Sequence, residues 1–170
     1  MSAVWIFMKP YLISKGINAD EVAMYVGIYG SGVGFIGGVL ASFISKKFSK
    51  KTVLISFAIF NVVAIVILIF IENYQLTIPL LLLAVTFTAL AIALSSAIIF
   101  SMIMDYSRDT SRGVDYAVAS SLFSFTRIIS AVIAGIIISN MGFGMMFLFE
   151  MIGMILVVFI IFRFYKEQEV

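Results

Sequence analysis

Long apolar stretches without a formal charge recur along this chain, and they constrain its fold more than any other feature. Val22 to Ser45 is one such stretch, and Thr52 to Ile71 is another. A helix needs about 20 mostly apolar residues to cross the hydrocarbon core of a bilayer. With 63% hydrophobic and only 12% charged residues, the chain does not have the composition of a water-soluble domain. We therefore predict an all-α, polytopic helical membrane protein.

The spacing of the apolar stretches predicts five full transmembrane helices, preceded by a truncated first one. Met1 to Ser14 is too short to cross a bilayer, and we interpret it as the last part of a longer helix. The full helices are expected at Val22 to Ser45, Thr52 to Ile71, Leu76 to Met104, about Val114 to Ser139, and Phe143 to Phe162. Together, residues 1–170 are expected to form a single transmembrane domain.

Lysine and arginine residues are distributed unequally between the loops on the two sides of the membrane. Lys9 and Lys15 are the basic residues expected on one side. The other side is expected to hold Lys46, Lys47, Lys50, Lys51, Arg108, Arg112, Arg163 and Lys166. Because cytoplasmic loops carry an excess of lysine and arginine, this second side and the carboxyl terminus are predicted to be cytoplasmic.

The segment from Asp105 to Asp115 concentrates charge at one end of a predicted helix. Its charged residues include Asp105, Arg108, Arg112 and Asp115. At a membrane surface these side chains can pair with one another, and we predict an ion-pair cluster here. A solvated charged loop without specific pairs is the alternative interpretation.

Two charged residues are expected inside the membrane. Arg127 lies roughly 13 residues from either end of its predicted helix, too deep for its side chain to reach the surface at about 1.5 Å of rise per residue. An arginine at this depth costs about 2.5 to 3.5 kcal/mol on insertion scales, so a partner or a polar cavity is expected. Arg127 therefore either binds solute or a central charge, or locks helices together.

Glu150 is the second intramembrane charge, about seven residues into the last predicted helix and roughly 10 Å from the outer face. It is either a carboxylate that titrates with protons or an interfacial side chain that reaches outward. The chain contains no histidine, so proton transfer would have to use carboxylates.

Glycine residues recur in the first full helix. Gly32 to Gly37 matches the GxGxxG dinucleotide pattern, but that pattern functions between a strand and a helix, and here it lies within an apolar run. Gly30, Gly34 and Gly38, followed by Ser42, place a small residue at every fourth position. Such a stripe lets another helix approach closely, and we predict that it packs helices together.

Several function classes are disfavoured by what the sequence lacks. It has no cysteine, no histidine and no GxSxG motif, and its predicted membrane segments hold no pair of catalytic acids. We therefore expect no enzyme activity, no metal site, no cofactor and no nucleic-acid partner.

The turn from Gly37 to Leu54 resembles the loop signature of the major facilitator superfamily, in which glycine and leucine end one helix and basic residues precede the next. Ser42 or a nearby residue stands where the signature usually has an aspartate. A plain cytoplasmic loop would also account for the four lysines.

A second similarity is to the branch that contains AmpG-type muropeptide permeases and related siderophore importers. It rests on Met104 to Arg108, on Gly113 to Tyr116, and on the arginine-bearing helix with Ala134 and Gly135 beyond it. Lys9 and Pro10 at the start fit the same branch. The chain resembles the carboxyl-terminal half of such a twelve-helix transporter, with its first helix incomplete.

This resemblance implies a proton-coupled importer of muropeptides in a bacterial inner membrane, or of siderophores as the alternative. Two six-helix bundles would rock about a central site faced by Arg127, with Glu150 as the second candidate, while the charged cluster would favour the inward-closed state. Lipid, protons, a small solute, and an amino-terminal half or a second copy are the implied partners. A nontransporting membrane remnant or scaffold from a split or decaying gene is the hypothesis from another class.

Overall fold

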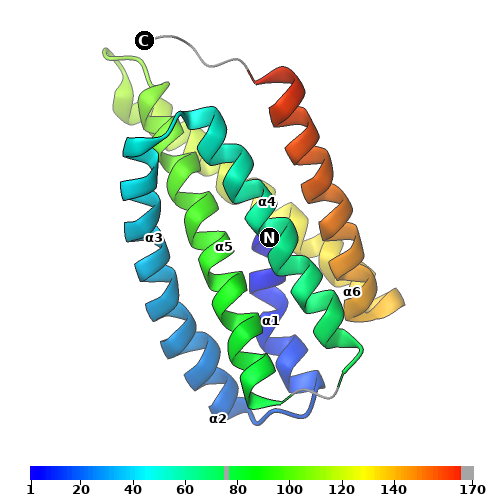
Figure 1. Ribbon diagram of the computed structural model, residues 1–170. Coiled ribbons are helices and arrows are strands. Elements are labelled where there is room, and N and C mark those ends of the chain that lie inside the picture. The colour runs from blue at the N-terminus through cyan, green and yellow to red at the C-terminus, as the bar shows by residue number, and fades with distance from the viewer. Residues whose placement is uncertain (75–76, 166–170) are drawn as a thin grey trace.

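The computed structural model describes residues 1–74 and 77–165, and these residues form a bundle of helices (Figure 1). The prediction of an all-α fold is confirmed. In chain order the elements are α1 (Ser2–Ser14), α2 (Ala19–Val22), the π-helix η1 (Ala23–Tyr29), α3 (Gly30–Lys47), α4 (Lys50–Glu72), α5 (Ile78–Asp105) and α6 (Arg112–Phe164).

Four helices in the described part of the chain are long and apolar enough to cross a membrane. They are Ala19–Lys47, which joins α2, η1 and α3, then Lys50–Glu72, Ile78–Asp105 and Arg112–Phe164. Each begins or ends within a few residues of a predicted boundary, apart from Leu76, which lies outside the described residues. The number differs from the predicted five because the last two predicted helices are joined in α6.

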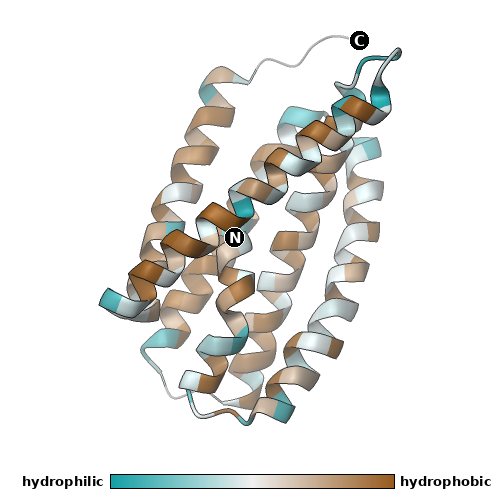
Figure 2. Cartoon of the chain, turned by 180° about the vertical axis from the view of Figure 1, so that it is seen from behind, coloured by the Kyte–Doolittle hydropathy of each residue, from teal (hydrophilic) through white to brown (hydrophobic). Residues whose placement is uncertain are grey.

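Helix α6 is a pair of helical arms that meet at Gly142. Its 53 residues would be about 80 Å long if straight, more than twice the thickness of a bilayer core. At Gly142 the backbone has φ 83° and ψ 175°, which are not helical values. Figures 1 and 2 show that the chain reverses there, so that residues 112–141 form a first arm and residues 143–164 a second arm.

The loops gather at the two ends of the bundle. The α3–α4 loop, the α5–α6 loop and the end of α6 lie at one end, at the top of Figure 1. The α1–α2 loop, the end of α4 and the start of α5 lie at the other. We call the first the lysine end, because Lys46, Lys47, Lys50 and Lys51 belong to it. This alternation of loops is the one that the sequence predicts.

Buried apolar side chains form two clusters along the length of the bundle. The larger cluster combines residues of α1, α2, η1, α4, α5 and both arms of α6, including Tyr11, Leu68 and Phe147. The smaller cluster lies toward the lysine end and is formed by Ala41, Val53, Phe57, Leu94 and Ile98. Among the described residues, the buried members of this cluster come from α3, α4 and α5.

Two glycines of α3 lie close to side chains of α1 and α5. A Cβ atom at Gly30 would lie 2.8 Å from the Trp5 ring, and one at Gly37 would lie 3.1 Å from Leu90. Gly34 is looser, with the Ala89 carbonyl oxygen 4.0 Å away, and no atom lies within 4 Å of a Cβ at Gly38. Close approach is therefore required at Gly30 and Gly37, while a role for Gly38 in packing remains a prediction.

Candidate functional site

Arg127 lies on an open groove between α1 and the first arm of α6. The groove is lined by Ile6, Ser124, Arg127, Ile128, Ala131 and Val132. The guanidinium is 6.0 Å from the centre of the Phe123 ring, on the same arm. Among residues 1–74 and 77–165 it forms no ion pair. A guanidinium offers a planar fork of donors that matches a carboxylate or phosphate group, so this side chain is available to an anionic partner.

Glu150 is on the second arm of α6 and does not pair with Arg127. Its Oε2 atom is 2.6 Å from the α-amino nitrogen of Met1 at the start of α1. It also lines a second groove, between the two arms, together with Ser130, Gly153 and apolar residues of both arms. The structure thus keeps apart the two intramembrane charges that the sequence suggests for a central site.

The predicted charged cluster at the lysine end consists of separate pairs. The Arg108 guanidinium forms a bidentate ion pair with the Asp115 carboxylate, with Nε 2.9 Å and Nη2 2.7 Å from its two oxygens. The backbone N–H of Arg108 also donates a hydrogen bond to this carboxylate. This carboxylate raises the pKa of the Arg108 guanidinium by hydrogen bonding and by its charge. Arg112 pairs with Asp109. Both pairs are local to the α5–α6 connection and to the first turn of α6.

Asp105 joins this region to α4. Its carboxylate lies 2.9 Å from the Lys50 ammonium, at the first residue of α4, and accepts a hydrogen bond from Ser101. The sequence identified both Asp105 and Lys50 as cytoplasmic charges but did not pair them. Both side chains are partly exposed, so the pair contributes about 0 to 1 kcal/mol to the free energy of unfolding. Its main effect is to hold the start of α4 against the end of α5.

Another ion pair, between Lys15 and Glu72, lies at the end of the bundle opposite the lysine end. The Lys15 ammonium lies 3.1 Å from Oε2 of Glu72 and 2.9 Å from the Glu72 backbone oxygen, linking the end of α1 to the end of α4. The same ammonium lies 5.7 Å from the centre of the Tyr11 ring. This pair could not be predicted from the sequence, because the two residues lie far apart in the chain and at the ends of different helices.

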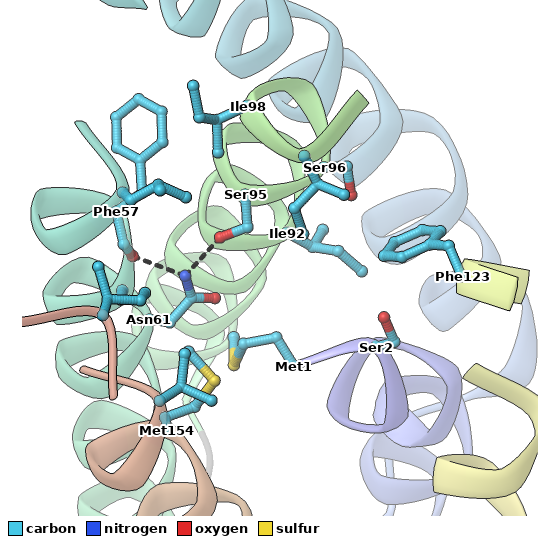
Figure 3. Close-up of a pocket in the computed structure, with 15 residues that line it drawn as sticks. Met1, Ser2, Phe57, Asn61, Ile92, Ser95, Ser96, Ile98, Phe123 and Met154 are labelled. Atoms are coloured by element: carbon cyan, nitrogen blue, oxygen red, sulfur yellow. Dashed lines mark hydrogen bonds between the residues drawn. The ribbon is translucent and has the colours of Figure 1, made fainter. Parts of the chain in front are cut away.

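Asn61 is a buried polar residue that was not among the residues predicted to be functional. Only 1% of it is exposed, midway along α4. Its Nδ2 atom donates to the Phe57 carbonyl oxygen and to Oγ of Ser95 on α5, each at 2.6 Å (Figure 3). The sequence did contain a signal for this residue. Asn61 is a single amide in the apolar run from Thr52 to Ile71, and polar groups at that depth in a membrane require partners.

Membrane-length apolar helices in one bundle, with charged pairs at both ends, define a polytopic helical membrane protein. Comparison with known proteins specifies the family. The model of the Major Facilitator Superfamily matches residues 1–170, and the chain belongs to this superfamily of membrane transporters.

One relative is similar over most of this chain. It is "Putative transporter AmpG 1" of Rickettsia bellii (strain RML369-C), 24% identical over 147 residues. The aligned region covers 86% of this chain but 36% of that protein, so the chain spans about a third of the relative's length. No solved structure matches the chain. The resemblance to the major facilitator superfamily and to its AmpG-like members is confirmed.

Proposed function

We propose that this chain is the carboxyl-terminal half of a secondary transporter that imports muropeptides with protons across a bacterial inner membrane. With the two arms of α6 counted separately, the described residues include five helices long enough to cross a bilayer, and the shorter α1 beside them. The similarity to a protein named as an AmpG transporter supports the solute class. The excess of lysine and arginine at one end supports a cytoplasmic carboxyl terminus.

The observation that carries this proposal is the open groove at Arg127. The guanidinium lies in the middle of a membrane-length arm, half-buried, and without an ion pair among the described residues. A charge at this depth is costly unless it meets an anion, and muropeptides carry carboxylates. The solute would bind between this half and an amino-terminal half, with Arg127 holding one carboxylate.

Proton coupling is proposed to use Glu150. The carboxylate lines the groove between the two arms of α6 and lies apart from Arg127. Solute and proton sites would then be separate and communicate through the first arm of α6, which contributes residues to both grooves. The ion pairs of Asp105, Arg108, Arg112 and Asp115 are proposed to hold the cytoplasmic end closed in one state of the cycle.

Uptake of labelled solutes tests the proposal. Cells that lack their own importers would express this chain alone or together with the amino-terminal half of an AmpG-like transporter, and would be offered a labelled muropeptide and a labelled ferric siderophore. We expect muropeptide uptake only when both halves are present. Uptake of the siderophore alone would favour the alternative solute, and no uptake with both halves in the membrane would favour a nontransporting remnant or scaffold.

A further inference from the structure

Most of the lysines at the lysine end have no acidic partner in the described part of the chain. Lys50 pairs with Asp105, and the ion pairs of the structure include none of the other three. The other aspartates near this end, Asp109 and Asp115, are each paired with an arginine. The described carboxylates of this end are therefore already paired, and unmatched positive charge remains. It is carried by Lys46, Lys47 and Lys51.

The unmatched charge is concentrated in one short segment. The three lysines fall within six consecutive residues, at the end of α3 and in the first turn of α4, at the top of Figure 1. Lys46 and Lys47 are exposed, and Lys51 is partly exposed. Like charges this close repel one another, and an anion held among them would offset that repulsion.

Aromatic side chains border the same segment. Phe48 is 53% exposed, and Phe162, at the end of the second arm of α6, is 69% exposed. The Lys51 ammonium lies 6.0 Å from the centre of the Phe162 ring, so α4 and the second arm of α6 both contribute to this part of the protein. We call Lys46, Lys47, Phe48, Lys51 and Phe162 together the basic surface.

The aromatic rings distinguish a lipid from a soluble anion as the partner of this surface. They lie at the ends of apolar helices of membrane length, where aromatic residues meet the headgroup region of a bilayer. A lysine stem can lie along apolar surface while its ammonium reaches the headgroups. An anionic phospholipid offers such a surface both a negative charge and acyl chains, whereas free phosphate offers only the charge. Clusters of lysine beside a membrane-spanning helix are typical of sites for anionic lipids.

We propose that the basic surface binds an anionic phospholipid, with the lysine ammonium groups at its phosphate and the two phenylalanine rings against its glycerol and upper acyl chains. The bound lipid would join the α3–α4 connection to the end of α6. This site lies apart from both grooves of the candidate functional site. The proposal therefore does not depend on the proposed solute or on proton coupling.

Quenching of tryptophan fluorescence by brominated lipids tests the proposal. The chain has one tryptophan, so Trp5→Phe removes the natural signal. Phe162→Trp then places a single reporter in the basic surface and keeps an aromatic ring there. Tyr74→Trp, at an exposed position at the opposite end of the bundle, is the matched control reporter. Each protein is reconstituted in phosphatidylcholine vesicles that contain increasing fractions of brominated phosphatidylglycerol or brominated phosphatidylcholine.

We expect Phe162→Trp to report at least a fivefold preference for phosphatidylglycerol over phosphatidylcholine, and Tyr74→Trp to report a ratio near one. Each basic residue near an anionic surface contributes about a fivefold preference, so one effective lysine is enough to give this result. Equal affinity for the two lipids at Phe162→Trp would overturn the proposal. The same preference at both ends would overturn it in favour of general attraction to the membrane.

Variants of the charges test which residues hold the lipid. In the Phe162→Trp protein, Lys51→Gln is expected to lower the preference severalfold, and its combination with Lys46→Gln and Lys47→Gln should remove it. Arg112→Gln is the matched control, because it removes the same charge at the same end from an arginine that already has a partner. An equal loss in Arg112→Gln would overturn the proposal. Unchanged quenching by brominated phosphatidylcholine shows that each variant is still folded in the membrane.

Inorganic phosphate distinguishes a lipid from a soluble phosphate group. Phosphate and chloride are added at equal ionic strength to the Phe162→Trp protein in vesicles that contain brominated phosphatidylglycerol. We expect the two salts to reduce the lipid preference equally, because both act only by screening. A stronger reduction by phosphate would overturn the proposal in favour of a soluble phosphate group at the lysines.

Discussion

Arg127 is the residue whose environment most directly supports the proposed function. It lies on a groove lined by one residue of α1 and by the first arm of α6, and Phe123 is its nearest aromatic neighbour. An arginine that locked helices together would be expected to meet a carboxylate of this chain, and none of the described carboxylates pairs with it. This observation favours an anionic solute or a charge from the other half of the transporter.

We predict that Arg127→Ala lowers muropeptide uptake at least tenfold when the chain is expressed with the amino-terminal half of an AmpG-like transporter. A hydrogen bond to a charged group contributes about 1.5 to 3 kcal/mol, which corresponds to a factor of roughly 10 to 150. Membrane insertion should not suffer, because removal of a central arginine favours insertion by about 2.5 kcal/mol or more. Arg163→Ala, at the lysine end, is the control, and normal uptake by Arg127→Ala would remove this residue from the mechanism.

Individual side chains show where sequence reasoning succeeds and where it stops. The depth of Arg127 and Glu150 follows from their positions within apolar runs, because helical rise converts sequence distance into depth. The difference in depth also indicates that the two side chains do not meet directly. The contact of Glu150 with the Met1 nitrogen does not follow from the sequence, since it depends on how α1 is placed against α6. The pairing of Lys50 with Asp105 likewise requires α4 and α5 to be placed side by side.

Among the elements, α6 is the one in which a single residue determines the path of the chain. Gly142 has φ 83° and ψ 175°, a region of backbone conformation that is essentially restricted to glycine. No atom lies within 4 Å of the position that a Cβ would take there. The requirement for glycine is therefore one of backbone conformation and not of space.

We predict that Gly142→Ala destabilises the protein by about 1 to 3 kcal/mol, the usual cost of a strained backbone. Gly153→Ala is a matched control, because Gly153 lies within the second arm and also has no atom within 4 Å of a Cβ. Alanine is favoured over glycine inside a helix by about 1 kcal/mol, so this control should be stable or slightly stabilised. Unfolding by SDS in mixed micelles measures both variants, and equal stability would contradict the assignment of strain to Gly142.

Element boundaries were largely predictable from the sequence. The run from Thr52 to Ile71 became α4, Lys50–Glu72, with its charged ends included, because a helix continues into the interface after its apolar residues end. The π-helix Ala23–Tyr29 was not predicted, since nothing in the local pattern of apolar residues distinguishes it from an α-helix. The turn at Gly142 falls between the two helices predicted at Val114 to Ser139 and Phe143 to Phe162.

At the scale of the whole molecule, lysine and arginine residues are distributed unequally between the two ends of the bundle. Four lysines, together with Arg108 and Arg112, lie at the lysine end, and Lys15 lies at the other. This separation agrees with the arrangement that the sequence predicts. It is also what sets the orientation of a helical membrane protein, because lysine and arginine favour the cytoplasmic side.

We predict that a cysteine at the lysine end is protected from a membrane-impermeant maleimide in intact cells, whereas one at the opposite end is labelled. Thr110→Cys and Asn18→Cys are suitable because both residues are exposed, each lies in a loop, and the natural chain has no cysteine. Permeabilised cells, in which both variants should react, provide the control. Labelling of Thr110→Cys in intact cells would reverse the proposed orientation.

The tight reversal at Gly142 also bears on how the protein is made. In the structure the two arms of α6 meet at Gly142, the one residue between Arg112 and Phe164 with non-helical backbone angles, and no polar loop separates them. During synthesis the two apolar arms emerge from the ribosome one directly after the other. Little hydrophilic chain lies between them that would have to cross the bilayer. Biogenesis of this part of the protein is therefore expected to proceed by lateral release of both arms together, as a preformed helical hairpin.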